Sequence, residues 1–178
     1  MDGSSVEKLL KQKKEAKKEI AKKLSFKAVR PLLAIVLDNE LAKDDEDLLK
    51  ELLGAIENLD VEAVILADSN LDAISFAHCT IIPYSQRSRT DMLQAADMAA
   101  CFSFNDVEEM MLNGAVPIAV KRPELKNYEP CHETGNSFIC TKDNIWGFFE
   151  ALVRALETFK LPYDWKNIVR EGVASVKN

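Results

Sequence analysis

Short, continuous apolar runs alternate along the chain with segments in which apolar residues recur every three or four positions. The continuous runs have the length and composition of strands buried on both faces, and they fall at 31–37, 61–67, 79–82, 98–102, 116–120 and 137–140. The periodic segments indicate helices, and they fall at 44–59, 71–77, 90–96, 107–113, 144–159 and 165–173. Strands that alternate with helices over short connections are typical of parallel sheets. The pattern predicts one three-layer α/β domain with a mainly parallel sheet of about six strands.

A lysine-rich segment precedes this alternation, and its spacing predicts one helix over 6–24. Lys13 and Lys17 interrupt the narrow apolar stripe of this helix midway. The stripe consists of Val6, Leu9, Leu10, Ile20 and Leu24. Two interpretations stay open: a solvated helix that lies on the domain, or a basic arm that contacts an acidic partner, RNA or a membrane surface. We divide the chain into a basic, linker-like helix at 1–27 and an α/β domain at 28–178.

Composition and charge narrow the classes of function. The 178 residues are 47% hydrophobic and 29% charged, as in soluble globular proteins, and the net charge of −6 argues against general affinity for nucleic acid. The longest apolar run is strand-sized, so we expect no contact with a membrane, and the N-terminus does not resemble a signal peptide. The four cysteines show neither a CxxC pair nor metal-ligand spacing. We therefore expect reduced thiols, no metal, no cofactor and a cytoplasmic location.

The common nucleotide motifs are missing from the sequence. It contains neither a GxGxxG sequence nor a Walker loop, so dinucleotide and P-loop sites have no support. We interpret His78 as structural, and we do not expect Cys131 and His132, on a polar loop, to form a metal or catalytic pair. Because a parallel sheet binds ligands beyond the carboxyl ends of its strands, the loops at those ends are where a site is expected.

Four segments carry a family resemblance, in order along the chain. Residues 36–44 (VLDNELAKD) resemble a strand followed by R-L-x-x-x-K-G, and residues 83–97 resemble a G-Y-x-x-x…A-D passage. Residues 109–117 (EMMLNGAVP) resemble E-A-M-x-x-G-x-x-P, and residues 134–138 (TGNSF) resemble T-G-x-x-F. Together they resemble the C-terminal, donor-side domain of glycogen and starch synthases, which are GT-B glycosyltransferases. The resemblance implies a Rossmann-like fold that binds a nucleotide sugar.

The resemblance also implies site residues and shows where this sequence departs from the family. Lys43 matches a phosphate-binding lysine, Tyr84 a tyrosine that stacks on the base, and Glu109 a glutamate on the ribose. Asp38 stands where the family has an arginine, and Cys101 where it has a glutamate at the reacting sugar. The family's glycine-rich turn is replaced by residues 121–125, which contain a proline and no glycine. No residue is therefore expected to be catalytic.

Three functions follow as expectations. The first is a glycosyltransferase C-terminal domain that is catalytically degenerate on its own and retains binding of ADP, UDP or an ADP- or UDP-sugar. The second is the donor-side half of a split glycosyltransferase, completed by a separate acceptor-side domain, because a lone donor domain cannot orient an acceptor. The third is a non-catalytic protein-interaction module in which the basic helix makes the contact.

Overall fold

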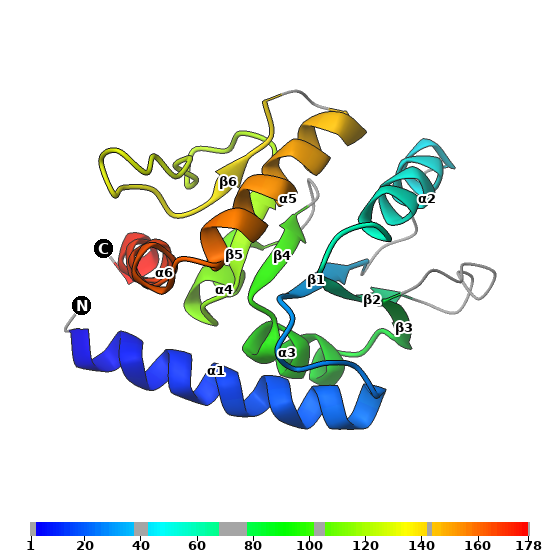
Figure 1. Ribbon diagram of the computed structural model, residues 1–178, viewed down its shortest axis with the longest axis horizontal. Coiled ribbons are helices and arrows are strands. Elements are labelled where there is room, and N and C mark those ends of the chain that lie inside the picture. The colour runs from blue at the N-terminus through cyan, green and yellow to red at the C-terminus, as the bar shows by residue number, and fades with distance from the viewer. Residues whose placement is uncertain (1–2, 38–42, 68–77, 102–105, 142–143, 178) are drawn as a thin grey trace.

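A parallel β-sheet forms the centre of the computed structural model (Figure 1), which describes residues 3–37, 43–67, 78–101, 106–141 and 144–177. Its strands are β1 (Leu32–Val36), β2 (Glu62–Ala67), β3 (Cys79–Pro83), β4 (Met98–Cys101), β5 (Val116–Ala119) and β6 (Phe138–Ile139). All six pair in parallel in the order β3-β2-β1-β4-β5-β6. The predicted parallel sheet is confirmed, and each strand lies within one or two residues of its predicted range over the described residues.

Helices cover both faces of this sheet. They are α1 (Gly3–Leu24), α2 (Lys43–Ile56), α3 (Gln86–Ala95), α4 (Val107–Leu112), α5 (Ile145–Phe159) and α6 (Pro162–Lys177). Side chains of α2, α5 and α6 join one buried cluster on one face, whereas α3 and α4 join a second cluster on the other. Alternate β1 residues supply the two clusters, with Leu33 and Ile35 in the first and Leu32 and Val36 in the second. The three-layer α/β fold is therefore confirmed. The predicted helix at 71–77 lies outside the described residues.

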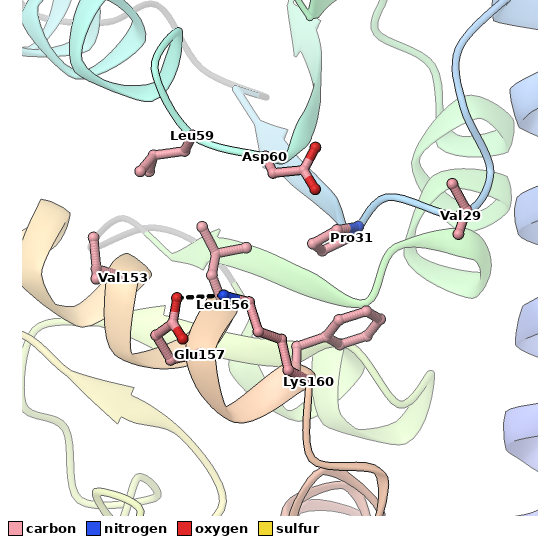
Figure 2. Close-up of a pocket in the computed structure, with 9 residues that line it drawn as sticks. Val29, Pro31, Leu59, Asp60, Val153, Leu156, Glu157 and Lys160 are labelled. Atoms are coloured by element: carbon pink, nitrogen blue, oxygen red, sulfur yellow. Dashed lines mark hydrogen bonds and ion pairs between the residues drawn. The ribbon is translucent and has the colours of Figure 1, made fainter.

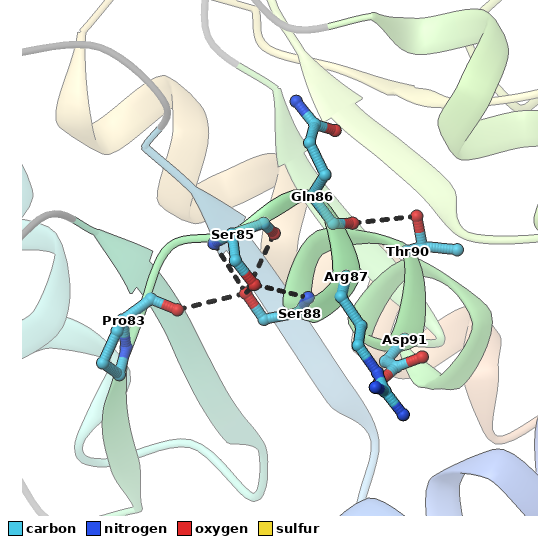
Figure 3. A network of polar contacts seen from close by, with 7 residues as sticks. All are labelled: Pro83, Ser85, Gln86, Arg87, Ser88, Thr90 and Asp91. Atoms are coloured by element: carbon cyan, nitrogen blue, oxygen red, sulfur yellow. Dashed lines mark hydrogen bonds and ion pairs between the residues drawn. The ribbon is translucent and has the colours of Figure 1, made fainter.

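Helix α3 begins four residues earlier than the pattern predicts, because polar side chains cap it (Figure 3). Ser85 Oγ accepts a hydrogen bond from the Ser88 backbone N–H at 3.0 Å, and Ser88 Oγ accepts one from the Ser85 N–H at 2.8 Å. This is a capping box in which serine replaces the more usual Glu or Gln. The amphipathic pattern misses the first turn, because residues 86–89 are polar and only Met92, Leu93 and Ala95 are buried.

Helix α1 packs against α3 and α6, and two of its lysines are buried where it meets the end of α3. Lys13 and Lys17 are only 4% and 6% exposed. The Lys13 ammonium donates to the carbonyl oxygens of residues 93, 94 and 96 at 3.0, 3.2 and 2.5 Å, which satisfies free carbonyls at the end of α3. Lys17 Nζ lies 2.5 Å from Asp97 Oδ2. The interpretation that these lysines interrupt the buried stripe is therefore wrong: they belong to it.

Candidate functional site

The carboxyl ends of the six strands meet along one edge of the sheet, which is where a fold of this kind binds ligands. The segments that the structure describes at this edge include 84–89 after β3, 106–109 at the start of α4, and 120–125 after β5. Two of the three predicted site residues, Tyr84 and Glu109, lie in these segments. Lys43 is the first residue of α2, and its side chain lies outside the described residues, as do Asp38 and the rest of 38–42.

Tyr84 directly follows β3. Its backbone N–H donates to the Ala67 carbonyl at 3.1 Å, so the backbone is still held to the end of β2 where the side chain leaves the sheet. The ring is half-buried against the second cluster, and its hydroxyl accepts a hydrogen bond from Gln86 Nε2 at 3.2 Å. The structure therefore places this aromatic ring at the expected edge, on a supported base. Its stacking on a nucleotide base stays a prediction.

Glu109 lies in the first turn of α4, which Asp106 caps by accepting hydrogen bonds from the backbone N–H groups of residues 108 and 109. Glu109 Oε2 lies 2.5 Å from Nη2 of Arg89, a residue of α3. The Arg89 side chain is 14% exposed and that of Glu109 is 32% exposed, so the pair is partly withdrawn from water. Arg89 thus connects the helix that follows Tyr84 to the helix that carries Glu109.

Arg89 is the residue of this edge that sequence reasoning missed. It falls in the polar first turn of α3, which the apolar pattern does not mark as helical. The Ser85–Ser88 capping box is the signal that could have shown the earlier start of the helix, and with it the position of Arg89.

Cys101 ends β4, at the position where the resemblance has a catalytic glutamate. It is 4% exposed, and burial raises the pKa of its thiol to about 11, which the positive charge of Arg122 opposes only in part. The group is therefore a buried, protonated thiol at neutral pH. It supplies neither a carboxylate for a reacting sugar nor a thiolate nucleophile.

The segment after β5 forms a tight turn of charged residues. The Leu125 N–H donates to the Arg122 carbonyl at 3.2 Å, and the Leu125 side chain is buried. Lys121 is exposed and Arg122 is half-buried. Pro123 has no N–H to offer an anion, so this turn has fewer backbone donors than a glycine-rich turn would have.

The histidines lie away from this edge. Arg30 Nη1 is 2.8 Å from His78 Nδ1 and 3.0 Å from Glu62 Oε1, and Arg30 Nε pairs with Asp60 at 2.7 Å. This network surrounds the amino ends of β1 and β2 and agrees with a structural role for His78. His132 Nδ1 lies 3.0 Å from Glu129 Oε2 on an exposed loop. Over the described residues, no three His, Cys, Asp or Glu side chains gather as a metal site would require.

A groove of about 300 Å³ lies at the opposite, amino-end edge of the sheet (Figure 2). Pro31 and Asp60, which precede β1 and β2, form one side, and Leu156 and Lys160 of the α5 end form the other. Lys160 Nζ pairs with Glu157 Oε1 at 2.6 Å on its wall. This groove is therefore separate from the edge that carries Tyr84 and Glu109.

Structural comparison identifies the fold. No protein-family model and no curated protein sequence matches the chain. The catalytic domain of starch synthase IV from Arabidopsis thaliana, bound to ADP and acarbose, matches with a TM-score of 0.72 at 19% identity, over 91% of this chain and 38% of that one. The C-terminal domain of LpcC, a group 1 family glycosyl transferase from Francisella tularensis, matches with a TM-score of 0.57 at 12% identity, over 83% and 84%. The chain has the fold of a GT-B glycosyltransferase C-terminal domain.

The same architecture occurs outside the transferases. A protein of Listeria monocytogenes described as a UDP-N-acetylglucosamine 2-epimerase matches with a TM-score of 0.51 at 15% identity, over 82% of this chain and 42% of that one. Likeness at such identities shows a shared fold, and chemistry has to be argued from side chains. No helix in the described residues is long and apolar enough to cross a membrane.

Proposed function

We propose that this chain is a donor-type nucleotide-binding domain that holds ADP, UDP or a nucleotide sugar at the carboxyl edge of its sheet and does not catalyse transfer by itself. The observation that carries the proposal is the position of Tyr84 and Glu109 at this edge, in a fold shared with a starch synthase structure that contains ADP. Tyr84 stacks on the base, Glu109 accepts hydrogen bonds from the ribose hydroxyls, and Lys43 contacts a phosphate.

The Arg89–Glu109 pair is compatible with this role. Arg89 Nη2 engages Glu109 Oε2, and the Glu109 side chain is still 32% exposed. A carboxylate fixed through one oxygen can accept hydroxyl hydrogen bonds at the other, as ribose binding requires. Arg89 also restrains the rotamer of Glu109, which reduces the conformational entropy lost on binding.

The residues at two positions that sugar transfer depends on argue against catalysis. Departure of a nucleoside diphosphate requires positive charge or N–H donors aimed at the phosphates. Here the turn after β5 contains a proline, which has no N–H, and Cys101, a buried and protonated thiol, occupies the position where the resemblance implies a glutamate at the reacting sugar. Binding without turnover is the function these residues support.

Nucleotide titration followed by amide chemical shifts tests this proposal. ADP, UDP and ADP-glucose are expected to shift the amides of residues 83–89 and 106–110, with saturation at millimolar ligand or below. Tyr84→Ala is expected to weaken binding about tenfold, since stacking of a base on an aromatic ring contributes about 1–3 kcal/mol. Tyr163→Ala, which removes a 64% exposed tyrosine of α6, is the matched control and should leave binding unchanged. Absence of shifts at 5 mM of all three ligands (a concentration on the order of the weakest useful affinities) contradicts the proposal.

A split glycosyltransferase is the second candidate. The chain spans 38% of the starch synthase structure, and a donor domain alone cannot orient an acceptor. An acceptor-side domain supplied as a separate chain would then complete the active site. Transfer of labelled glucose from ADP-glucose to a glucan, measured with and without such a domain, distinguishes the two candidates: restored transfer supports the split enzyme, and binding without transfer supports the first proposal.

A further inference from the structure

The inner face of α1 is fixed to the domain. Lys13 is bound to the end of α3, Lys17 to Asp97, and Val6 and Ala21 are buried beside them. Lys166 of α6 also pairs with Glu7 at 2.5 Å. The orientation of α1 is thereby set, and so is the identity of the residues on its outer face.

Five lysines of the outer face form a row that we call the lysine stripe: Lys8, Lys11, Lys14, Lys18 and Lys22. All are exposed. At about 100° per residue they fall within a sector of about 120° that excludes the buried residues, and the row extends over about 21 Å. The large exposed hydrophobic residues of the described chain all lie outside α1. Contact with this face would therefore be electrostatic.

Within the described residues, one lysine of the stripe forms an ion pair with a carboxylate of the chain. Lys18 pairs with Glu15 at 3.0 Å, and both side chains are more than half exposed. Residues 3–24 contain eight lysines and three glutamates, a formal charge of +5, in a chain whose net charge is −6. The remainder therefore carries −11, and α1 is a basic element on an acidic domain.

We propose that the lysine stripe is a docking surface for an acidic protein segment. A uniform polyanion fits less well, because Glu15 lies within the sector of the stripe and Glu19 lies next to it, and both would repel a continuous row of negative charges. A protein segment can place carboxylates opposite the lysines and leave these two glutamates uncontacted. Since charges interact over about 8 Å at physiological salt, such a segment responds to the stripe more than to the distant acidic surface. An acidic helix of about 14 residues has the matching length.

Peptide binding tests the proposal. The probe is a fluorescein-labelled, 20-residue helical peptide of alanine and glutamate with glutamates at i, i+3 and i+7, and the full chain is titrated into it at 150 mM salt. Binding is expected to weaken as salt rises. The stripe variant is Lys8→Glu, Lys11→Glu, Lys14→Glu and Lys22→Glu. Its affinity should fall about tenfold or more, because exposed ion pairs contribute little singly and several must be removed together.

A control variant with the same change of net charge keeps the result specific. It carries Lys121→Glu, Lys126→Glu, Lys160→Glu and Lys177→Glu, all at exposed positions outside α1. Unchanged peptide affinity in this variant supports the proposal, whereas an equal loss shows that net charge alone governs binding and overturns it. Absence of peptide binding, or tighter binding of a uridine oligonucleotide or of phosphatidylserine vesicles, also overturns it. Circular dichroism confirms that both variants are folded. Titration of the stripe variant with ADP shows whether nucleotide binding is retained, so that a failure of this proposal can be told apart from a failure of the proposed function.

Discussion

Asp97→Asn is expected to be the most damaging conservative substitution in the described part of this chain. Asp97 Oδ2 accepts hydrogen bonds from Lys17 Nζ at 2.5 Å and from the Leu32 N–H at 2.8 Å, and the residue is 7% exposed. Asparagine retains an oxygen for the Leu32 N–H but removes the negative charge. The ammonium of Lys17 is then left buried without a counter-ion, close to Lys13, which is buried as well.

The size of the effect follows from this geometry. Leaving one member of a buried ion pair uncompensated costs about 3–5 kcal/mol, a large part of the ~5–15 kcal/mol by which a domain is stable. The free energy of unfolding is measured by urea denaturation, followed by circular dichroism and by the fluorescence of buried Trp165. Glu15→Gln, which removes the exposed pair with Lys18, is the control and should change the free energy by less than about 0.5 kcal/mol.

A double-mutant cycle separates the charge from the packing. Lys17→Met together with Asp97→Asn replaces the pair by neutral side chains of similar volume, and most of the lost stability should return. Two results would refute the reasoning: a loss below about 1 kcal/mol in Asp97→Asn, or a double variant as unstable as the single one.

Two further predictions concern the same framework. Burial lowers the pKa of Lys13 from 10.5 to about 7, so between these values the unfolded chain binds more protons than the folded chain. The free energy of unfolding of the unmodified chain, compared with that of Lys13→Met, should therefore rise by about 2–4 kcal/mol from pH 7 to pH 10, as measured by urea titration. A difference between the two proteins that does not change with pH contradicts this. Gly135 has φ +118°, and a Cβ there would lie 2.5 Å from the Asn127 carbonyl oxygen. Gly135→Ala should lower the free energy of unfolding by about 2 kcal/mol or more. At Gly172 an added Cβ would have contacts no closer than 3.4 Å, so Gly172→Ala should change the free energy of unfolding by no more than about 1 kcal/mol. Thermal unfolding of both variants measures the difference.

The sheet could be predicted because its signal is local. A parallel strand buried on both faces is a continuous apolar run, so 61–67 in the sequence and Glu62–Ala67 in the structure differ by one residue. Helix α3 was predicted too short because its first turn buries almost nothing and is stabilised by Ser85 and Ser88 instead. Such capping depends on individual side chains and not on hydrophobic periodicity.

The buried lysines show where prediction from a single sequence stops. Lysine is normally exposed, so Lys13 and Lys17 were interpreted as interruptions of the apolar stripe, although the helical spacing places them on it. Their partners are the carbonyl groups at the end of α3 and the carboxylate of Asp97, about eighty residues away in the chain. Only the folded arrangement brings these groups together. The Arg89–Glu109 pair escaped prediction for the same reason, although Glu109 itself was identified from the resemblance.

Helix α3 connects the two proposed binding surfaces. Its amino end follows Tyr84 and carries Arg89, the partner of Glu109, while the carbonyl groups at its carboxyl end bind Lys13 of α1. A ligand changes affinity at a second site only if it binds two states of the protein differently. A segment that docks on the outer stripe leaves the inner contacts of Lys13 and Lys17 as they are, so nucleotide and acidic segment should bind independently. Coupling would require α1 to leave α3, and the cost of exposing these two buried lysines and Asp97 opposes that step.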